Sequence, residues 1–184
     1  MTFDRPDCES AVQELLTHKH ITEALYRAAR GVDRLDGDLI RSAYHPGALD
    51  HHGYVDGTVE DFIEWLENVH AETIISCVHD LHNILIDIRG DTAYSETYVL
   101  VYQRVVDEEN VKDKVAHGRY LDVFEHKHGE WKIAERTVIL DWNRLDALGE
   151  TGAILANDHP QGTRSREDAS YRILPDGFAL QHLT

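Results

Sequence analysis

The stretch ILIDIRGDTAYSETYVLVYQRVV, residues 84–106, decides the fold class. Isoleucines alternate with other residues at its start, the Arg89-Gly90-Asp91 triplet is typical of a turn, and the run that follows is rich in β-branched and tyrosine residues. Two similar segments, 115–126 and 131–141, come next, and turn sequences separate them. The second half of the chain therefore predicts an antiparallel meander of long strands.

Helical patterns precede these strands. Apolar residues recur at intervals of three and four over residues 8–30, with a break expected near His18 and an interruption at Gly31. Asp36 is placed to cap a short second helix, and the segment 58–61 has the pattern of a capping box for a third. Because helices come first and the strands follow in a row, the order favours an α+β fold over a parallel βαβ sheet.

Composition and charge limit the possible partners. The 184 residues suit one domain with a sizeable core, and 18 Lys and Arg against 34 Asp and Glu give a net charge of −16. Such an acidic surface repels phosphate backbones and anionic lipids, so we expect neither a nucleic-acid nor a membrane partner. The N-terminal segment lacks a signal-peptide pattern and no apolar run has the length of a bilayer span, so we expect a cytoplasmic protein.

The chain offers many candidate metal ligands but no recognisable ligand spacing. Cys8 and Cys77 form neither a zinc-finger spacing nor a disulfide framework, and Cys77 lies among apolar residues as a buried thiol would. His79 and His82 are three residues apart at an expected strand start, where alternation sends them to opposite faces. The other candidates are scattered: His45, Asp50, His51, His52 and Asp80. We therefore expect no metal and no cofactor.

The polar segment SCVHDLHN, residues 76–83, is the best candidate for acid–base chemistry. On an extended strand His79, Leu81 and Asn83 share one face, while Ile84 and the isoleucines after it occupy the other. A histidine that faces a cavity acts as a general base near neutral pH when a carboxylate fixes its tautomer. Spacing alone does not exclude a purely structural histidine. It also leaves three carboxylates open as partners: Asp33, Asp36 and Asp38.

Tyrosines alternate along one strand face at Tyr94, Tyr98 and Tyr102, and Tyr120 on the next strand can join them. Such a stripe is usually core, but inside a curved sheet it would also line a pocket for a ring-shaped ligand. The chain has no G-x-S-x-G motif, catalytic cysteine context or glycine-rich phosphate loop, so nucleophilic catalysis has little support.

Taken in order, several segments resemble the SnoaL-like branch of the NTF2-like superfamily: ALYRAARGVDRLDGDLIRSAYHPGA, HDLHN, GDTAYSETYV, GRYLDVFEHKHGEWKIAER and the closing strand. Within it the chain is similar to the group of scytalone dehydratase, lindane dehydrochlorinase and bile-acid 7α-dehydratase. The resemblance implies an α+β cone (α+β barrel), in which N-terminal helices pack on the concave face of a strongly curved mixed, mostly antiparallel sheet. It assigns residues 1–145 to this cone and leaves 146–184 as a tail that is either a lid or a subunit-contacting extension.

The resemblance also implies roles for single residues. In the dehydratase and dehydrochlorinase members a histidine abstracts a proton and an aspartate orients it, and these positions fall on His79 and Asp33. A closing-strand arginine falls on Arg136, where its charge would stabilise a departing anion or an enolate. A phenolic residue of the dehydratases falls near His52, with Tyr54 adjacent, and either would assist a leaving hydroxyl. The substrate-binding residues expected in all are Tyr26, His52, Tyr54, Asn83, Tyr94, Tyr98 and Tyr120.

The function implied by the resemblance is that of a cofactor-independent, dehydratase-like lyase or an isomerase acting on a hydrophobic cyclic small molecule. Ala28 stands where some members carry a lysine one turn before the aspartate, which argues against dehydrohalogenation of the same substrate. A polyketide cyclase-like or ketosteroid isomerase-like reaction would use the same base and stays open. A non-catalytic ligand-binding or assembly subunit, like the β subunits of ring-hydroxylating dioxygenases, also stays open. In each case we expect a homo-oligomer, a trimer or a dimer, because a partner usually covers the open sheet of this fold.

Overall fold

The computed structural model describes residues 7–107, 110–148 and 159–173, so the parts 149–158 and 174–184 of the expected tail lie outside the described residues. The elements in chain order are α1 (Cys8–Arg34), α2 (Gly37–Ala43), β1 (Tyr44–His51), β2 (Asp56–Thr58), α3 (Val59–Trp65), a π-helical turn (Leu66–His70), α4 (Ala71–Thr73), β3 (Ile74–Arg89), β4 (Thr92–Asp107), β5 (Asn110–Lys127), β6 (Glu130–Ala147) and α6 (Ala169–Ile173).

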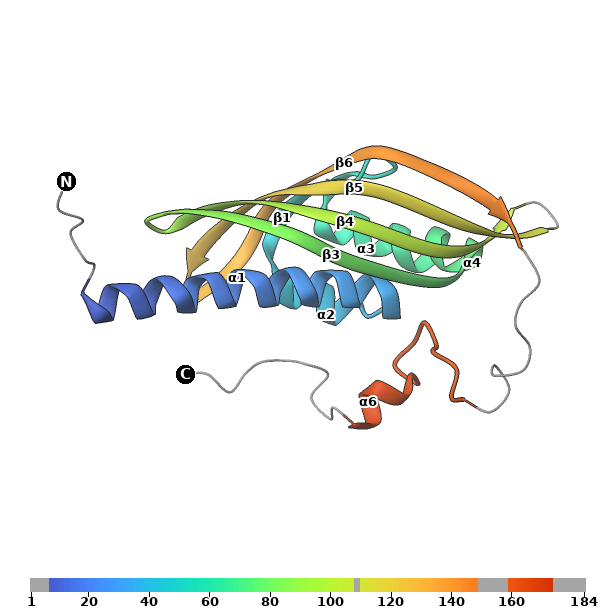
Figure 1. The fold of residues 1–184 in the computed structure, drawn as a ribbon, viewed down its shortest axis with the longest axis horizontal. Coiled ribbons are helices and arrows are strands. Elements are labelled where there is room, and N and C mark those ends of the chain that lie inside the picture. Colours follow the sequence, from blue (N-terminus) through green and yellow to red (C-terminus); the bar gives the residue numbers. More distant parts are fainter. Residues whose placement is uncertain (1–6, 108–109, 149–158, 174–184) are drawn as a thin grey trace.

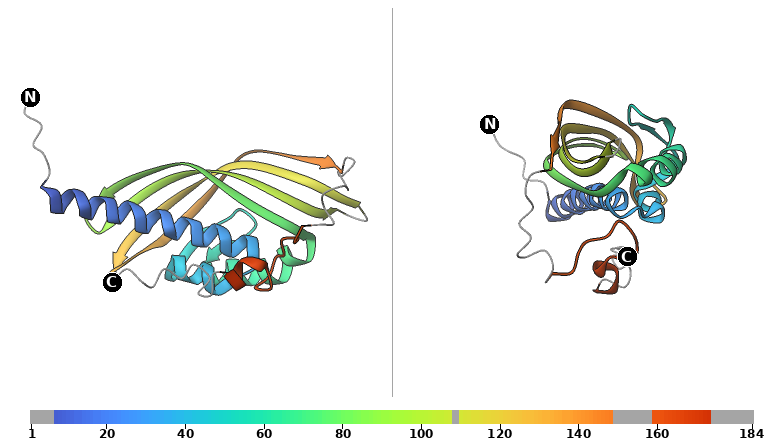
Figure 2. Two further views of the ribbon diagram at one scale, coloured as in Figure 1. Left: turned by 60° about the horizontal axis from the view of Figure 1, so that its bottom comes forward. Right: turned by 90° about the vertical axis from the view of Figure 1, so that its right-hand side faces the viewer.

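One six-stranded sheet in the order β2-β1-β6-β5-β4-β3 curves over the helices (Figure 1). Among the described strands, β1 and β6 pair in parallel and the other neighbours are antiparallel. Helix α1 runs lengthwise along the sheet, and α3 and α4 lie beside one end of it (Figures 1 and 2). The expected α+β fold with helices on a curved mixed sheet is confirmed. The sheet is open, with β2 and β3 as its edges, so it is not a closed barrel.

Helix α1 is continuous, so the break expected near His18 and the interruption at Gly31 are both wrong. Gly31 instead permits a close contact, because a Cβ there would lie 2.5 Å from the Ile40 side chain of α2. The helix ends at Leu35, a left-handed residue with φ of 51°. As a result Asp33 lies in the last turn of the helix and not in a loop after it.

Two expected helix caps are confirmed. The Asp36 carboxylate accepts a hydrogen bond of 3.1 Å from the Leu39 N–H, and Thr58 and Asp61 form a reciprocal capping box at the start of α3. Beyond α3 the helix widens into the π-helical turn, which puts His70 at a buried position. Such turns are rare and occur frequently at functional sites.

A register shift in β3 changes which residues share a face. The strand begins at Ile74, well before the expected start, so the polar segment 76–83 lies inside it. Its pairing with β4 shifts between Leu81 and Ile84, and the two residues of the bulge are left over. His79, Leu81 and Ile84 therefore lie on one face. The expectation that Asn83 shares the His79 face while Ile84 faces away is wrong, and Asn83 is exposed.

The hydrophobic core lies between the helices and the concave face of the sheet. Its fully buried large side chains include Ile21, Leu25, Phe62, Phe124 and Ile133. The large apolar residues near the start of α1, which belong to the helical pattern of the sequence, are exposed: Val12, Leu15 and Leu16. The core-packed part of α1 is therefore its C-terminal part, which carries Asp33.

The described part of the tail, residues 159–173, lies near the C-terminal end of α1 (Figure 2). Arg164 donates a hydrogen bond of 3.0 Å to the Val32 carbonyl, and the Tyr171 hydroxyl donates one of 2.7 Å to Asp36. The last carbonyls of a helix have no intrahelical partner, so the arginine satisfies groups that α1 leaves open. This stretch of the tail is therefore tied to the cone domain.

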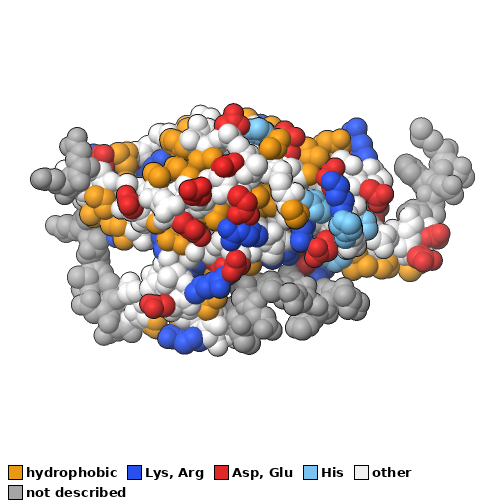
Figure 3. Space-filling view, turned by 180° about the vertical axis from the view of Figure 1, so that it is seen from behind, with side chains coloured by type: hydrophobic (Ala, Val, Ile, Leu, Met, Phe, Trp, Pro, Cys, Tyr) orange, Lys and Arg blue, Asp and Glu red, His pale blue; other side chains and the backbone are white. Residues whose placement is uncertain are grey.

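Acidic and basic side chains are mixed over the described surface and do not form separate regions. In Figure 3, Asp and Glu side chains are spread among hydrophobic, Lys and Arg side chains, and the described residues on this face form no basic patch. A basic patch or stripe is the usual footprint of nucleic-acid binding. No helix within the described ranges is long and apolar enough to span a membrane.

Gly118 marks a close approach of β5 and β6 at a register shift, where a Cβ would lie 2.2 Å from the Ile139 carbonyl oxygen. Gly118→Ala must force the strands apart, and we expect denaturant unfolding to show a loss of about 1–3 kcal/mol in the free energy of unfolding. Gly162→Ala is the matched control, because its Cβ would be 3.8 Å from the nearest atom. Equal stability of the two variants would contradict the close approach.

Candidate active site

A cavity of about 530 Å³ lies between the concave face of the sheet and the α3–α4 region. Its walls are largely apolar, and a few polar side chains converge on it: His52, His70, Gln103, Lys114, His79, Tyr120 and Asn143. Apolar walls with a small number of placed polar groups are typical of sites for small organic molecules. The volume is also within the range of such sites.

His79 and Asp33 form a buried pair at the wall of this cavity. The Asp33 carboxylate accepts a hydrogen bond of 3.1 Å from the backbone N–H of His79 and lies 2.6 Å from its ring Nδ1. The two side chains are only 7% and 13% exposed. Because the carboxylate holds Nδ1–H, Nε2 is the nitrogen left to accept a proton. This is the arrangement of an oriented general base.

The surroundings of His79 favour its protonated form. Burial alone lowers the pKa of His79, but Tyr120, the Cys77 thiol and the hydrogen bond to Asp33 outweigh it and raise that pKa well above its ordinary value. The Cys77 sulfur lies 3.7 Å from Nδ1. His79 is therefore a strong base that becomes available as the pH rises through its raised pKa.

A second histidine–carboxylate pair lines the same cavity, at the end of β1. His52 Nδ1 lies 2.6 Å from Asp50 Oδ1, and the Tyr44 hydroxyl donates a hydrogen bond of 2.9 Å to the other Asp50 oxygen. Asp50 is fully buried, and the His52 ring stacks on Phe62 with the ring centroids 4.4 Å apart. Burial raises the pKa of Asp50, but the bond to His52 and neighbouring positive charge lower it overall, so the carboxylate is ionised.

The Asp50–His52 pair was not expected, although each residue was a candidate by itself. The sequence signal for this pair is the two-residue spacing of Asp50 and His52, because residues i and i+2 of an extended strand face the same side. His51, between them, faces away and pairs with Asp56 at the surface. Alternation along the segment 50–52 could therefore have identified the buried pair.

Arg136 is not among the described residues that line the cavity. Its guanidinium makes two hydrogen bonds to the buried Asp122 carboxylate, of 2.7 and 2.9 Å, and lies 4.2 Å from the centroid of the Tyr120 ring. The direct contact with a departing anion that the resemblance implied is therefore not what this geometry offers. Arg136 instead supports Tyr120 from behind by a cation–π contact.

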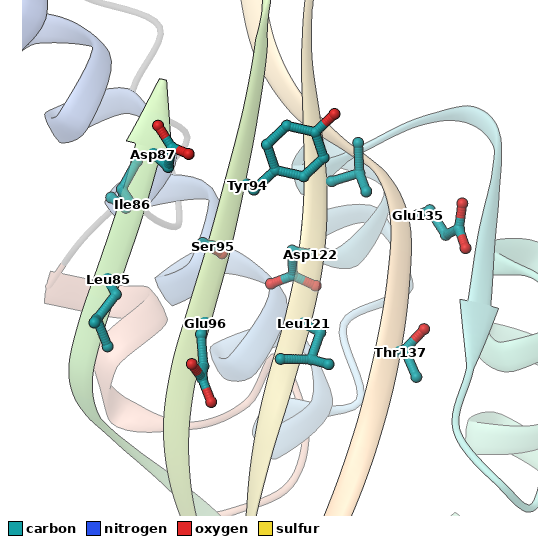
Figure 4. A pocket seen from close by; sticks show the side chains of 11 residues that line it. Leu85, Ile86, Asp87, Tyr94, Ser95, Glu96, Leu121, Asp122, Glu135 and Thr137 are labelled. Atoms are coloured by element: carbon teal, nitrogen blue, oxygen red, sulfur yellow. The ribbon is translucent and has the colours of Figure 1, made fainter. Parts of the chain in front are cut away.

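The expected binding residues divide between the cavity and other surfaces. Tyr54 and Tyr120 line the cavity, whereas Tyr26 lines a second pocket against α1, which shares His79 with the cavity and also includes Asp33. Tyr94 lies on the outer face of the sheet, in a groove formed by β3, β4, β5 and β6 (Figure 4). Tyr98 follows Tyr94 by four residues in regular pairing and so lies on the same outer face, which means that the structure does not bring the tyrosine stripe of β4 into the cavity.

His70 is a cavity residue that had no signal in the sequence beyond its place in a helical pattern. The Arg164 guanidinium lies 3.2 Å from its Nδ1 and the Gln103 amide nitrogen lies 3.1 Å from its Nε2, so an N–H donor approaches each ring nitrogen. Burial and the charge of Arg164 lower the pKa of His70 to about 3. His70 is therefore a neutral, fixed polar group and not a second base.

Asp33, Cys77 and His79 also place three possible metal-ligand atoms within 4.8 Å of one another. A thiolate, an imidazole and a carboxylate are ligands that zinc accepts. The same Nδ1 and carboxylate atoms already form the hydrogen bond of the pair, so a metal would have to displace it. That no metal binds stays a prediction.

Residues 13–137 match the SnoaL-like domain family. A hexachlorocyclohexane dehydrochlorinase from Novosphingobium barchaimii has a similar structure, with a TM-score of 0.69 and 14% identity over 77% of this chain and 99% of that chain. A candidate scytalone dehydratase from Novosphingobium aromaticivorans has a TM-score of 0.64 and 16% identity over 80% and 98%. An NTF2-like superfamily protein from Salmonella enterica has a TM-score of 0.57 and 17% identity over 75% and 95%. No curated protein matches the sequence.

NMR of the imidazole rings as a function of pH tests the electrostatics of the site. We expect His79 to titrate above about pH 6.5, the ordinary value, and its pKa to fall in Asp33→Asn, because the substitution removes the negative charge that stabilises the imidazolium. His70, with a pKa of about 3, should stay neutral throughout and serves as the internal reference. A His79 pKa at or below the ordinary value would contradict the assignment.

Proposed function

This chain belongs to the SnoaL-like domain family, and we propose that it is a cofactor-independent lyase or isomerase for a hydrophobic cyclic small molecule. One observation carries the proposal: a buried carboxylate, Asp33, holds Nδ1 of His79 at the wall of a largely apolar cavity. The fold neighbours include a dehydrochlorinase and a candidate dehydratase, and both names describe β-elimination.

The reaction begins with proton abstraction. Nε2 of His79 takes a proton from a carbon next to an activating carbonyl, and the Asp33 carboxylate stabilises the imidazolium that forms. The electron pair moves toward the carbonyl oxygen, which needs a hydrogen-bond donor in a water-poor site. Tyr120 lines the cavity, and burial raises the pKa of its hydroxyl, so it stays protonated and can donate to this oxygen.

The cavity walls suit a flat, ring-shaped substrate. Phe62, Trp65 and Tyr54 present aromatic rings to it, and the Tyr54 and Trp65 rings are parallel within 4° at 5.9 Å. Aromatic walls favour stacking with unsaturated rings. Loss of a leaving group would give an alkene or an aromatic product, and return of the proton to another carbon would give an isomer. Attack of the enolate carbon on a second carbonyl of the same molecule, with the proton delivered to that carbonyl oxygen, would give a cyclised product.

The rival role is that of a non-catalytic binding or assembly subunit. The buried Arg136–Asp122 ion pair agrees with that role, because an arginine tied into the structure has no need of a substrate. The open cavity speaks for the enzyme, since a cone used only for assembly has no reason to keep a cavity of about 530 Å³ with two oriented histidines. Measured turnover of a substrate distinguishes the enzyme from the non-catalytic subunit.

A panel of bicyclic β-hydroxy and β-acetoxy ketones tests the proposal. In 3-hydroxy-1-tetralone, loss of water followed by tautomerisation gives 1-naphthol, which can be followed by fluorescence. We expect His79→Gln to lower kcat/KM by about 10²- to 10⁴-fold, the usual contribution of a general base, and Asp33→Asn to act in the same direction. In the wild type, kcat/KM should rise as His79 loses its proton, at a pH above its ordinary pKa.

His51→Gln is the matched control, because His51 pairs with the Asp56 carboxylate at the surface and lies outside both pockets that His79 lines. It should leave kcat/KM unchanged, and so should a metal chelator. Full activity of His79→Gln would refute the base. Loss of activity with the chelator would instead favour a metal at Asp33, Cys77 and His79.

We also propose that the protein self-associates as a dimer or trimer through the outer face of the sheet. That face exposes large apolar side chains from four strands: Leu85, Tyr94, Tyr102, Leu121 and Trp142. Apolar patches of this kind mark interfaces in soluble proteins.

Sedimentation velocity tests the oligomer. Leu121→Asp puts a charge in the outer-face groove of Figure 4 and should shift the protein to monomer. Leu15→Asp is the control, because Leu15 is 70% exposed on α1 and not on the sheet. A monomeric wild type would refute self-association, and an unchanged oligomer in Leu121→Asp would refute this interface.

A further inference from the structure

Lys114 on β5 differs from the other lysines of the chain because no carboxylate of the described residues pairs with it. The other four each form an ion pair with a nearby acidic side chain: Lys19 with Glu23, Lys112 with Asp107, Lys127 with Glu125 and Lys132 with Glu130. The ammonium group of Lys114 instead lies 6.0 Å from the centroid of the Tyr54 ring. In a protein of net charge −16, a lysine without a carboxylate is an exception that needs a reason.

Lys114 lines the cavity, and its charge acts on groups inside it. Its side chain is half-buried, and it pairs across the sheet with Gln103, another polar residue of the cavity wall. Burial is the first cause that lowers the pKa of His70 to about 3, and the charges of Arg164 and Lys114 act in the same direction. The positive charge of Lys114 therefore reaches the interior of the cavity.

The cavity differs in charge from the rest of the protein. The chain has 34 Asp and Glu, yet no acidic side chain is among the described residues that line the cavity. Asp33 and Asp50 are not among these lining residues, and each carboxylate lies 2.6 Å from a histidine ring nitrogen. A cavity with apolar walls and an uncompensated cation attracts anions, because a low dielectric strengthens the interaction between charges.

The position of Lys114 suits the charged end of an otherwise apolar ligand. Tyr54, beside the ammonium group, is 73% exposed, so this end of the cavity faces solvent. An anionic group held here keeps part of its hydration while its ring enters the apolar part of the cavity, which lowers the cost of desolvation. One ammonium group balances the single charge of a carboxylate, whereas a phosphate monoester carries a charge of about −1.5 to −2.

Strand pairing sets the distance between Lys114 and the proposed base. Ala116, two residues further along β5, pairs with Val101, and Val101 pairs with His79 on β3. Two residues of a strand span about 7 Å, a distance that a bicyclic ring can bridge. A ligand can therefore contact Lys114 with one end and His79 with the other.

We propose that Lys114 binds a carboxylate of the substrate at the mouth of the cavity, and that the substrates are therefore ring compounds with a carboxylate on the ring system. This inference rests on the proposed function, because it names a group on the substrate of the same cavity. The charge pair orients the ring so that its far end, with the carbon that loses a proton, lies toward His79. Lys114 thus selects and positions the substrate and takes no part in the proton transfer.

Two naphthalene probes of nearly the same shape test the inference: 2-naphthoate carries a carboxylate and 2-naphthamide is neutral. We expect calorimetry to give a Kd for 2-naphthoate about 10-fold below that for 2-naphthamide, because hydrogen bonds between charged groups are the stronger ones. Lys114→Gln should abolish this preference, and Lys114→Arg, which keeps the charge, should retain most of it. Unchanged binding of 2-naphthamide in both variants would show that they fold.

Lys112→Gln is the matched control, because Lys112 lies two residues away on the same strand, pairs with Asp107 and is not among the described residues of the cavity lining. It should keep the full preference for 2-naphthoate. His79→Gln should keep it as well, since the carboxylate binds to Lys114 and not to the ring of the base.

Three results would overturn the inference: no binding of 2-naphthoate, equal affinity of the wild type for the two probes, or a preference that depends on His79 and persists in Lys114→Gln. Each would leave the proposed function standing, because turnover of uncharged bicyclic ketones tests that function. Binding of 2-naphthoate through Lys114 without turnover of any ketone would instead overturn the proposed function and leave a carboxylate-binding cavity.

Discussion

The structure depends on one carboxylate that joins a helix to a sheet. Asp33 lies in the last turn of α1, where the helix dipole disfavours a negative charge. Two hydrogen bonds from His79 compensate, one from the backbone N–H and one from the ring. Removing either partner would leave a buried polar group unpaired, at a cost of about 1–3 kcal/mol or more. The same contact that docks α1 on β3 therefore also orients the His79 ring.

The cavity exists because the sheet is bent and open at one end. The bulge in β3 puts Ile84 on the same face as His79, and β5 and β6 approach each other closely at Gly118, which lines the cavity. The π-helical turn adds His70 from the helical side. Polar side chains thus reach one space from different elements, while the hydrophobic core fills the rest of the cone.

The fold class could be predicted from alternation and turn chemistry, because those signals are local. The caps at Asp36 and Thr58 were predictable for the same reason. The side of β3 on which Asn83 lies could not be predicted, because the bulge depends on how β3 and β4 pair and not on the sequence of either strand alone. The Asp33–His79 pairing came from resemblance, as spacing left three carboxylates open. The ion-pair partner of Arg136 could not be predicted either. Asp122 lies on the neighbouring strand, and the register between β5 and β6 decides which residue faces Arg136.

The tail contact has a consequence for the order in which the protein is made. Arg164 binds backbone carbonyls of α1, among them that of Asp33, which precedes it by 131 residues. During synthesis the helix and its carboxylate emerge first, the sheet that carries His79 follows, and the arginine comes later than all of them. The nascent chain can therefore assemble the cone before the end of α1 is capped. The contacts of Arg164 with the end of α1 and with His70 are therefore among the last that the new chain can make.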